Sequence, residues 1–228
     1  MSDFVHQLLF GIYPYVCLAV FLLGSLVRFE REQYTWKSDS SQLLRRGQLR
    51  WGSNLFHIGI LMLFFGHLFG MLVPMDFYHT LGLSTPAKQM LAISAGAIFG
   101  VMCLVGLVLL VHRRLAEARI RATSTPMDIF ILLWILATLL LGLVSILFSL
   151  QHREGGVMLL LVQWAQHIAT FRGGAADFIR EVPWIYRVHL FFGLTVFLLF
   201  PFSRLVHVWS GFGALAYLTR AQQIVRSR

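Results

Sequence analysis

Residues 51–74 are almost wholly apolar and read WGSNLFHIGILMLFFGHLFGMLVP. A helix of about 20 apolar residues crosses a hydrocarbon core about 30 Å thick, so this stretch is long enough to span a bilayer. It also contains His57 and His67. Because ionisable side chains are rare and costly inside a bilayer, a histidine there indicates a functional site. The stretch therefore predicts a membrane protein whose other spans provide partners for two histidines.

The remaining sequence fits an integral membrane protein. Hydrophobic residues make up 57% of the 228 residues and charged residues only 13%, whereas soluble domains carry about 25% charged residues. We predict an all-α fold, a single membrane domain of residues 1–228 built as a bundle of five transmembrane helices. Their expected ranges are 4–27, 51–73, 88–111, 127–150 and 184–209, with a tail at 210–228.

Two local features modify this picture. Pro14 lies inside the first span and is expected to kink it. Residues 157–171 are apolar but too short to cross, and we expect an amphipathic helix that lies against the membrane. Its apolar face would comprise Val157, Leu160, Leu161, Trp164, Ile168 and Phe171.

The basic residues predict the orientation. Fourteen of the nineteen Lys and Arg residues fall after the first span, after the third span or from Arg204 onwards, and five fall on the other side. Cytoplasmic loops carry the excess of Lys and Arg, so the N-terminus is expected to be periplasmic and the C-terminus cytoplasmic. This placement accounts for the net charge of +9 without a nucleic-acid partner.

The fifth span carries His189 and His207. In the antiparallel arrangement His67 and His189 lie towards the outer side, and His57 and His207 towards the inner side. Eighteen residues make five helical turns, so His189 and His207 should face the same way. On straight helices the separation along the axis would be about 27 Å from His189 to His207 and about 15 Å from His57 to His67. Tilt or a large bridging ligand would have to absorb this difference.

Haem iron takes two axial imidazoles from facing helices, and filling both positions suits electron transfer. We therefore predict two haems between the second and fifth spans. They would be non-covalent b haems, because the chain has no C-x-x-C-H motif. The predicted axial ligands of iron are His57, His67, His189 and His207.

Other residues would complete the haem sites. Gly66, Gly70 and Gly193 would provide flat walls for the porphyrin, and Arg187 and Arg204 are candidates for contacts with haem propionates. Each also has a simpler explanation, since glycines allow close helix packing and interfacial arginines extend to the headgroups.

Histidines within a membrane also hydrogen-bond between helices, and a transporter of metal ions or protons is the alternative from another class. No repeated pair of broken helices favours that alternative. The other histidines fall at span ends or in loops, and no ligand role is assigned to His6, His79, His112, His152 and His167.

Several strings of residues carry a family resemblance. They are IYPY at 12–15, QYTW at 33–36, SNLFHIGIL at 53–61, GHLFGML at 66–72, KQ at 88–89, RAT at 121–123, FLLFPFSRLVHVWS at 197–210 and YLTR at 217–220. With these strings the chain resembles the gamma subunit of bacterial respiratory nitrate reductase, a five-span di-haem cytochrome b.

The resemblance implies a role for each matched residue. His67 and His189 would ligate a distal haem towards the periplasm, and His57 and His207 a proximal haem towards the cytoplasm. Lys88 matches the family's lysine near the distal haem, where it would hydrogen-bond quinol beside His67. From the residues alone, Lys88 is equally an interfacial anchor.

The resemblance also implies a function in the bacterial cytoplasmic (inner) membrane. The subunit would oxidise membrane quinol, menaquinol or ubiquinol, and release protons to the periplasm. Electrons would pass through the distal and then the proximal haem to an iron–sulfur beta subunit. A molybdenum-containing alpha subunit would then reduce nitrate. The alternative is the b-type anchor of another quinone-linked enzyme, such as a formate dehydrogenase, a hydrogenase or a sulfur-metabolism complex.

Overall fold

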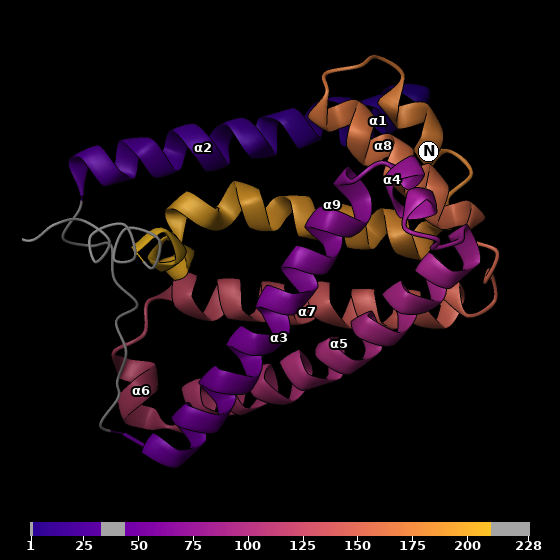
Figure 1. Cartoon of the computed structure of the whole chain (residues 1–228). Coiled ribbons are helices and arrows are strands. Elements are labelled where there is room, and N and C mark those ends of the chain that lie inside the picture. Colours follow the sequence, from indigo (N-terminus) through magenta and orange to yellow (C-terminus); the bar gives the residue numbers. More distant parts are fainter. Residues whose placement is uncertain (1, 33–43, 211–228) are drawn as a thin grey trace, which may run out of the picture.

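The computed structural model describes residues 2–32 and 44–210, and within these ranges it contains helices and no strands (Figure 1). The predicted tail, apart from its first residue, and Lys37 of the first basic loop lie outside the described residues. The elements are α1 (Asp3–Gln7), η1 (Leu8–Ile12), α2 (Tyr13–Arg31), α3 (Arg46–Leu72), α4 (Met75–Thr80), α5 (Thr85–Ala116), α6 (Ala118–Ala122), α7 (Pro126–Ser149), α8 (Gly156–Ala169), η3 (Ala175–Ile179), α9 (Trp184–Leu199), η4 (Phe200–Phe202) and η5 (Arg204–Val206).

Five helical segments of the described chain are long and apolar enough to cross a membrane, which confirms the predicted number of spans. Their bounds are Asp3–Arg31, Arg46–Leu72, Thr85–Ala116, Pro126–Ser149 and Trp184–Phe202. The first segment joins α1, η1 and α2. Its π-helical turn, η1, comes just before Pro14, where a kink was expected.

The spans pack in a chain of neighbours. α3 lies along α5, α5 along α7, α7 along α9, and α9 along α2. Figure 1 shows α2, α9, α7 and α5 following one another, with α3 crossing obliquely over them. α3 is the least buried of the five spans within the described protein. The helix that carries His57 and His67 therefore packs on α5 and keeps much of its surface open.

Small residues bring α3 and α5 into backbone contact. A Cβ added to Gly106 would lie 2.3 Å from the Phe56 backbone nitrogen, and one added to Gly59 would lie 2.6 Å from the Cβ of Cys103. Such close approach is possible only where side chains are minimal. This contact fixes the rotation of α3 about its own axis and hence the direction of its histidines.

α8 corresponds to the expected amphipathic helix, with one correction. Trp164 and Ile168 are buried in a core cluster shared with α9 and η3. The Trp164 Nε1–H donates to the Phe10 carbonyl oxygen at 2.9 Å. The helix ends at Ala169, however, and Phe171 has a φ of 56° and is 82% exposed. Assigning Phe171 to the apolar face was wrong, because the chain has already left the helix.

The expectation of one continuous fifth helix over residues 184–209 is also wrong. α9 ends at Leu199, the 3₁₀ helices η4 and η5 follow with an extended Ser203 between them, and α-helix resumes at His207. Pro201 explains the break, because proline has no N–H and its ring clashes with the carbonyl four residues earlier. A rise counted along one straight axis therefore does not describe the separation of His189 and His207.

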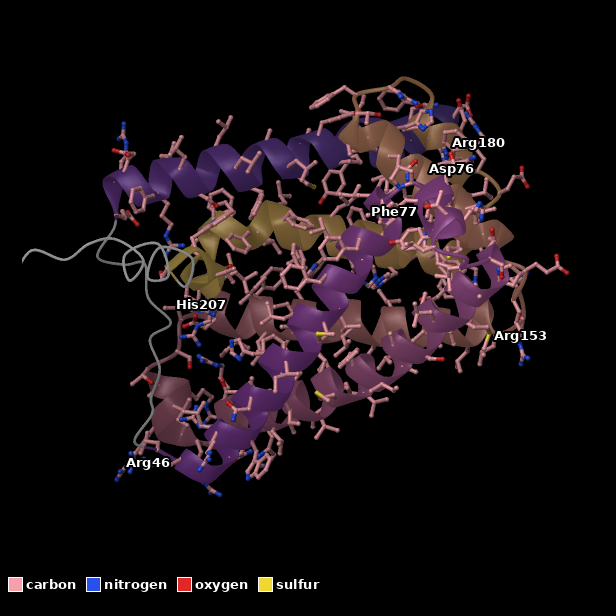
Figure 2. The ribbon with its side chains drawn as sticks, in the orientation of Figure 1. Arg46, Asp76, Phe77, Arg153, Arg180 and His207 are labelled. Carbon is pink, nitrogen blue, oxygen red and sulfur yellow. The ribbon has the colours of Figure 1, made fainter. Side chains whose placement is uncertain are left out.

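The bundle has two distinct ends. In Figure 2, His207 lies at the same end as Arg46, while Asp76, Phe77, Arg153 and Arg180 lie at the opposite end. The N-terminus lies at this second end, together with α1, α4 and α8 (Figure 1).

Candidate functional site

The structure brings the four span histidines together in two pairs. The ring centroids of His57 and His207 are 6.1 Å apart, and those of His67 and His189 are also 6.1 Å apart. One member of each pair comes from α3, and the other comes from α9 or the helix that resumes after η5. These are the two pairs expected from depth in the membrane.

All four imidazole rings make the same kind of hydrogen bond. Each Nδ1 donates to a backbone carbonyl oxygen, which assigns the proton to Nδ1 and leaves the lone pair on Nε2. Metal-bound histidines are usually held in this way through the nitrogen that does not bind the metal. The acceptors are Ser53 O at 2.7 Å from His57, Leu63 O at 2.7 Å from His67, Thr138 O at 3.0 Å from His189, and Arg204 O at 2.6 Å from His207.

The spacing within each pair fits one metal ion between two imidazoles. A metal–nitrogen bond of about 2.0–2.1 Å puts each ring centroid about 3 Å from the metal, so two opposed rings lie about 6 Å apart. Among residues 2–32 and 44–210, no three His, Cys, Asp or Glu side chains gather as a metal site. Each pair thus offers two protein ligands, the number that a bis-histidine haem requires.

Glycines border the space near the His67–His189 pair. A Cβ added to Gly66, Gly70 or Gly193 would meet no atom within 4 Å, so these positions border open space, as flat walls for a porphyrin would. Gly142 on α7 was not anticipated. A Cβ there would lie 2.9 Å from the His189 Cε1 atom, so only glycine at position 142 allows α7 to approach the imidazole this closely. This contact joins helices far apart in sequence, and no local pattern reveals it.

Lys88 lies near the His67–His189 pair. Its Nζ donates to the Gly70 carbonyl oxygen at 2.8 Å, one turn beyond His67, and lies 3.1 Å from the Met75 sulfur. The same Nζ lies 4.1 Å from the centroid of the Tyr78 ring. At 4% exposure, Lys88 is buried rather than extended to the surface as an interfacial anchor would be. Sequence reasoning did not single out Met75 or Tyr78.

The two arginines proposed for propionate contacts lie at opposite ends. The Arg204 Nε lies 3.3 Å from Asp128 Oδ1, and Asp128 also lies 3.8 Å from Arg114 Nη1. Arg187 is partly exposed on the first turn of α9. Their role toward propionates stays a prediction.

The histidines without an assigned ligand role hydrogen-bond elsewhere in the described chain. Their partners are Ala176 O for His6, Thr85 Oγ1 for His79, Gln48 Nε2 for His112, Phe148 O for His152 and Gln163 O for His167.

Five apolar spans indicate a multi-pass membrane protein, and each of its two facing imidazole pairs offers two nitrogen ligands. The family model of the nitrate reductase gamma subunit matches residues 6–228. The chain belongs to this family, which confirms the resemblance read from the sequence.

Three relatives illustrate the range of similarity. The chain is 51% identical to the respiratory nitrate reductase 2 gamma chain of Escherichia coli strain K12, over 100% of both chains. It is 38% identical to the nitrate reductase gamma chain of Bacillus subtilis strain 168, over 97% of this chain and 98% of the relative. It is 27% identical to the Hdr-like menaquinol oxidoreductase cytochrome b-like subunit of Archaeoglobus profundus, over 68% of this chain and 46% of the relative.

Proposed function

We propose that this chain is the quinol-oxidising di-haem cytochrome b subunit of a membrane-bound nitrate reductase. The observation that carries the proposal is the pairing of four histidines at 6.1 Å, each with Nδ1 bound to a carbonyl oxygen. Family membership supports the assignment to a nitrate reductase. When bound, the two haems would carry electrons from quinol on the His67–His189 side to an iron–sulfur beta subunit on the His57–His207 side.

The residues of the chain would divide the remaining work. The paired histidines hold Nε2 ready as an axial ligand, and His207 and His57 form the proximal site on the cytoplasmic side. His67 and His189 form the distal site, and Arg187 and Arg204 would neutralise propionates. The basic loops would dock the beta subunit, which in turn feeds a molybdenum-containing alpha subunit that reduces nitrate.

Lys88 is the residue proposed to bind quinol. Its buried ammonium on α5 contacts the turn of α3 beyond His67, and in the presence of quinol it would donate to a quinol oxygen instead of the Gly70 oxygen. Desolvation strengthens such a charge-assisted hydrogen bond. Protons released here would leave on the periplasmic side. Electrons that move inward work against the membrane potential, at a cost of about 2.3 kcal/mol per charge per 100 mV for a full crossing. The free energy released by nitrate reduction must exceed this cost.

Haem content is the deciding measurement. A pyridine haemochrome assay on the purified complex is expected to give two b haems per chain. A folded chain without haem, made with ample haem supply, would refute the proposal and favour a metal or proton transporter. One haem per chain would contradict the two-site form of the proposal.

A second quinone-linked function has one observation in its favour. The archaeal relative is named as a menaquinol oxidoreductase subunit rather than a nitrate reductase subunit. An anchor of another quinone-linked enzyme would bind the same haems but would not support nitrate reduction. Quinol-driven nitrate reduction by the purified complex separates the two functions.

A further inference from the structure

The break between α9 and the helix that carries His207 interrupts the regular α-helical hydrogen bonds. The Leu205 N–H, which would bond the Pro201 oxygen in a continuous helix, points instead to Ser203 Oγ at 3.3 Å. Carbonyls freed at a proline within a membrane protein must be satisfied by neighbouring helices.

Arg28 on α2 donates to two carbonyl oxygens of the break. Its Nη1 donates to the Pro201 oxygen at 2.7 Å and to the Ser203 oxygen at 2.9 Å. Gly24, one turn earlier on α2, allows the approach, because a Cβ there would lie 2.8 Å from the Pro201 Cγ. One face of α2 therefore holds the broken segment through a close contact and a forked hydrogen bond.

The anchored segment leads directly to the histidine. Ser203 O is bound by Arg28, and the next carbonyl, Arg204 O, accepts from His207 Nδ1 at 2.6 Å. On the other side, Arg204 Nε lies 3.3 Å from Asp128 of α7. The position of the His207 ring is thus set through a short segment fixed between α2 and α7.

We propose that Arg28 is a positioning residue for the His57–His207 site, and this inference rests on the proposed haem-binding function. By binding the two carbonyls of the break, Arg28 fixes the height and direction at which His207 meets His57. His189 lies on α9 before the break and His67 lies on the continuous helix α3, so the His67–His189 pair does not depend on this contact. The guanidinium suits the task because it is a rigid planar donor, whereas an amine on the same stem is a single point charge.

The test compares variants in the full complex. R28Q is expected to retain the proximal haem about 10-fold less well than the unmodified chain, the lower end for groups that orient metal ligands. The distal haem should stay at its full level, and R28K should give an intermediate proximal occupancy. Haem content, redox titration and the low-spin electron paramagnetic resonance signals quantify the two haems separately.

Two further variants separate positioning from charge and folding. G24A changes no charge but pushes Pro201 away from α2, so it should weaken the same haem. R31Q removes an exposed arginine from the same helix and should leave both haems unchanged. Equal loss of both haems in R28Q, or the same change in R31Q, would overturn the positioning role.

The result in the unmodified complex distinguishes the two levels of inference. Two haems there, with an unchanged proximal signal in R28Q and G24A, would refute only the role of Arg28. Absence of haem from the folded unmodified complex would refute the proposed function and this inference together.

Discussion

Lys88 Nζ on α5 donates to the carbonyl oxygen of Gly70 on α3 at 2.8 Å. In a continuing helix that oxygen would accept from the N–H of residue 74, but residue 74 is proline and has none. The Tyr78 hydroxyl donates to Phe69 O at 2.9 Å, an oxygen that also accepts from the Val73 N–H at 3.1 Å. Lys88 therefore completes the end of α3, and this structural role must be separated from its proposed role toward quinol.

Replacing Lys88 by alanine is expected to lower quinol-driven nitrate reduction by about 100-fold, the lower end for removing one hydrogen-bond donor to a reacting oxygen. Both haems should remain bound, because the lysine is not a ligand. The rate is measured with purified complex and a reduced quinol analogue, and the haem content of the same sample is measured by its optical spectrum.

The variant Lys88→Gln provides the matched control, since its amide can still donate to Gly70 O but carries no charge. A quinol role predicts that Gln is nearly as slow as Ala. If Gln restored the full rate, or if Ala lost the distal haem, Lys88 would act as a helix cap rather than at the quinol site.

The histidine pairs predict how single replacements should group. H67A and H189A are expected to lose the same haem, and H57A and H207A to lose the other, because one missing axial ligand removes low-spin ligation at its pair. Loss of the distal haem should also abolish quinol-driven nitrate reduction. Reduction driven by an artificial donor to the partner subunits should persist. Optical and electron paramagnetic resonance spectra of the four variants check the grouping, and H57A matching H67A would contradict it.

Three prolines show which features of the fold can be predicted from the sequence and which cannot. Pro14 would leave the Phe10 oxygen without its helical donor, Pro74 does so for Gly70, and Pro201 breaks the fifth helix. Side chains of Trp164, Lys88 and Arg28 take up carbonyls at these three places. A proline predicts a local disturbance, but the partner that satisfies it comes from a helix distant in sequence.

The spans and the histidine pairing were predictable for a physical reason. Hydropathy is a local property, and antiparallel spans place residues at depths that follow from the helical rise. Pro201 causes the break after Leu199, but the place of the broken segment is set by its contacts with Arg28 and Gly24 of α2, and Gly142 of α7 packs against the His189 ring. These contacts arise from tertiary packing and are not visible in the local sequence. The prediction of a straight fifth helix was therefore wrong.

Gly142 is expected to be essential for the distal site. In G142A the new methyl group would lie 2.9 Å from His189 Cε1, so the ring must move and its haem should be retained about 10-fold less well. Alanine is favoured over glycine within a helix by about 1 kcal/mol, so helix propensity cannot cause such a loss.

The proximal haem serves as the internal standard for G142A. The control variant is G47A, because a Cβ at Gly47 meets no atom within 4 Å. Unchanged spectra in G142A would show that the His189 ring does not depend on this contact.

Gly106 should affect both sites together, because it sets the contact between α3 and α5. In G106A the added Cβ would lie 2.3 Å from the Phe56 nitrogen and 2.8 Å from the Gly52 oxygen, both of them backbone atoms that cannot rotate away. Overpacking of this kind costs about 1–3 kcal/mol. Because α3 carries one histidine of each pair, its displacement should loosen both haems in parallel and lower the temperature at which haem is released.

The matched control is G96A, on the same helix. There the added Cβ would lie 3.3 Å from Ile146 Cδ1, the end of a side chain that can rotate. G96A should therefore release haem at the temperature of the unmodified complex. Loss of only one haem in G106A would contradict the view that α3 is positioned as a rigid unit, since a rigid shift of this helix must disturb His57 and His67 alike.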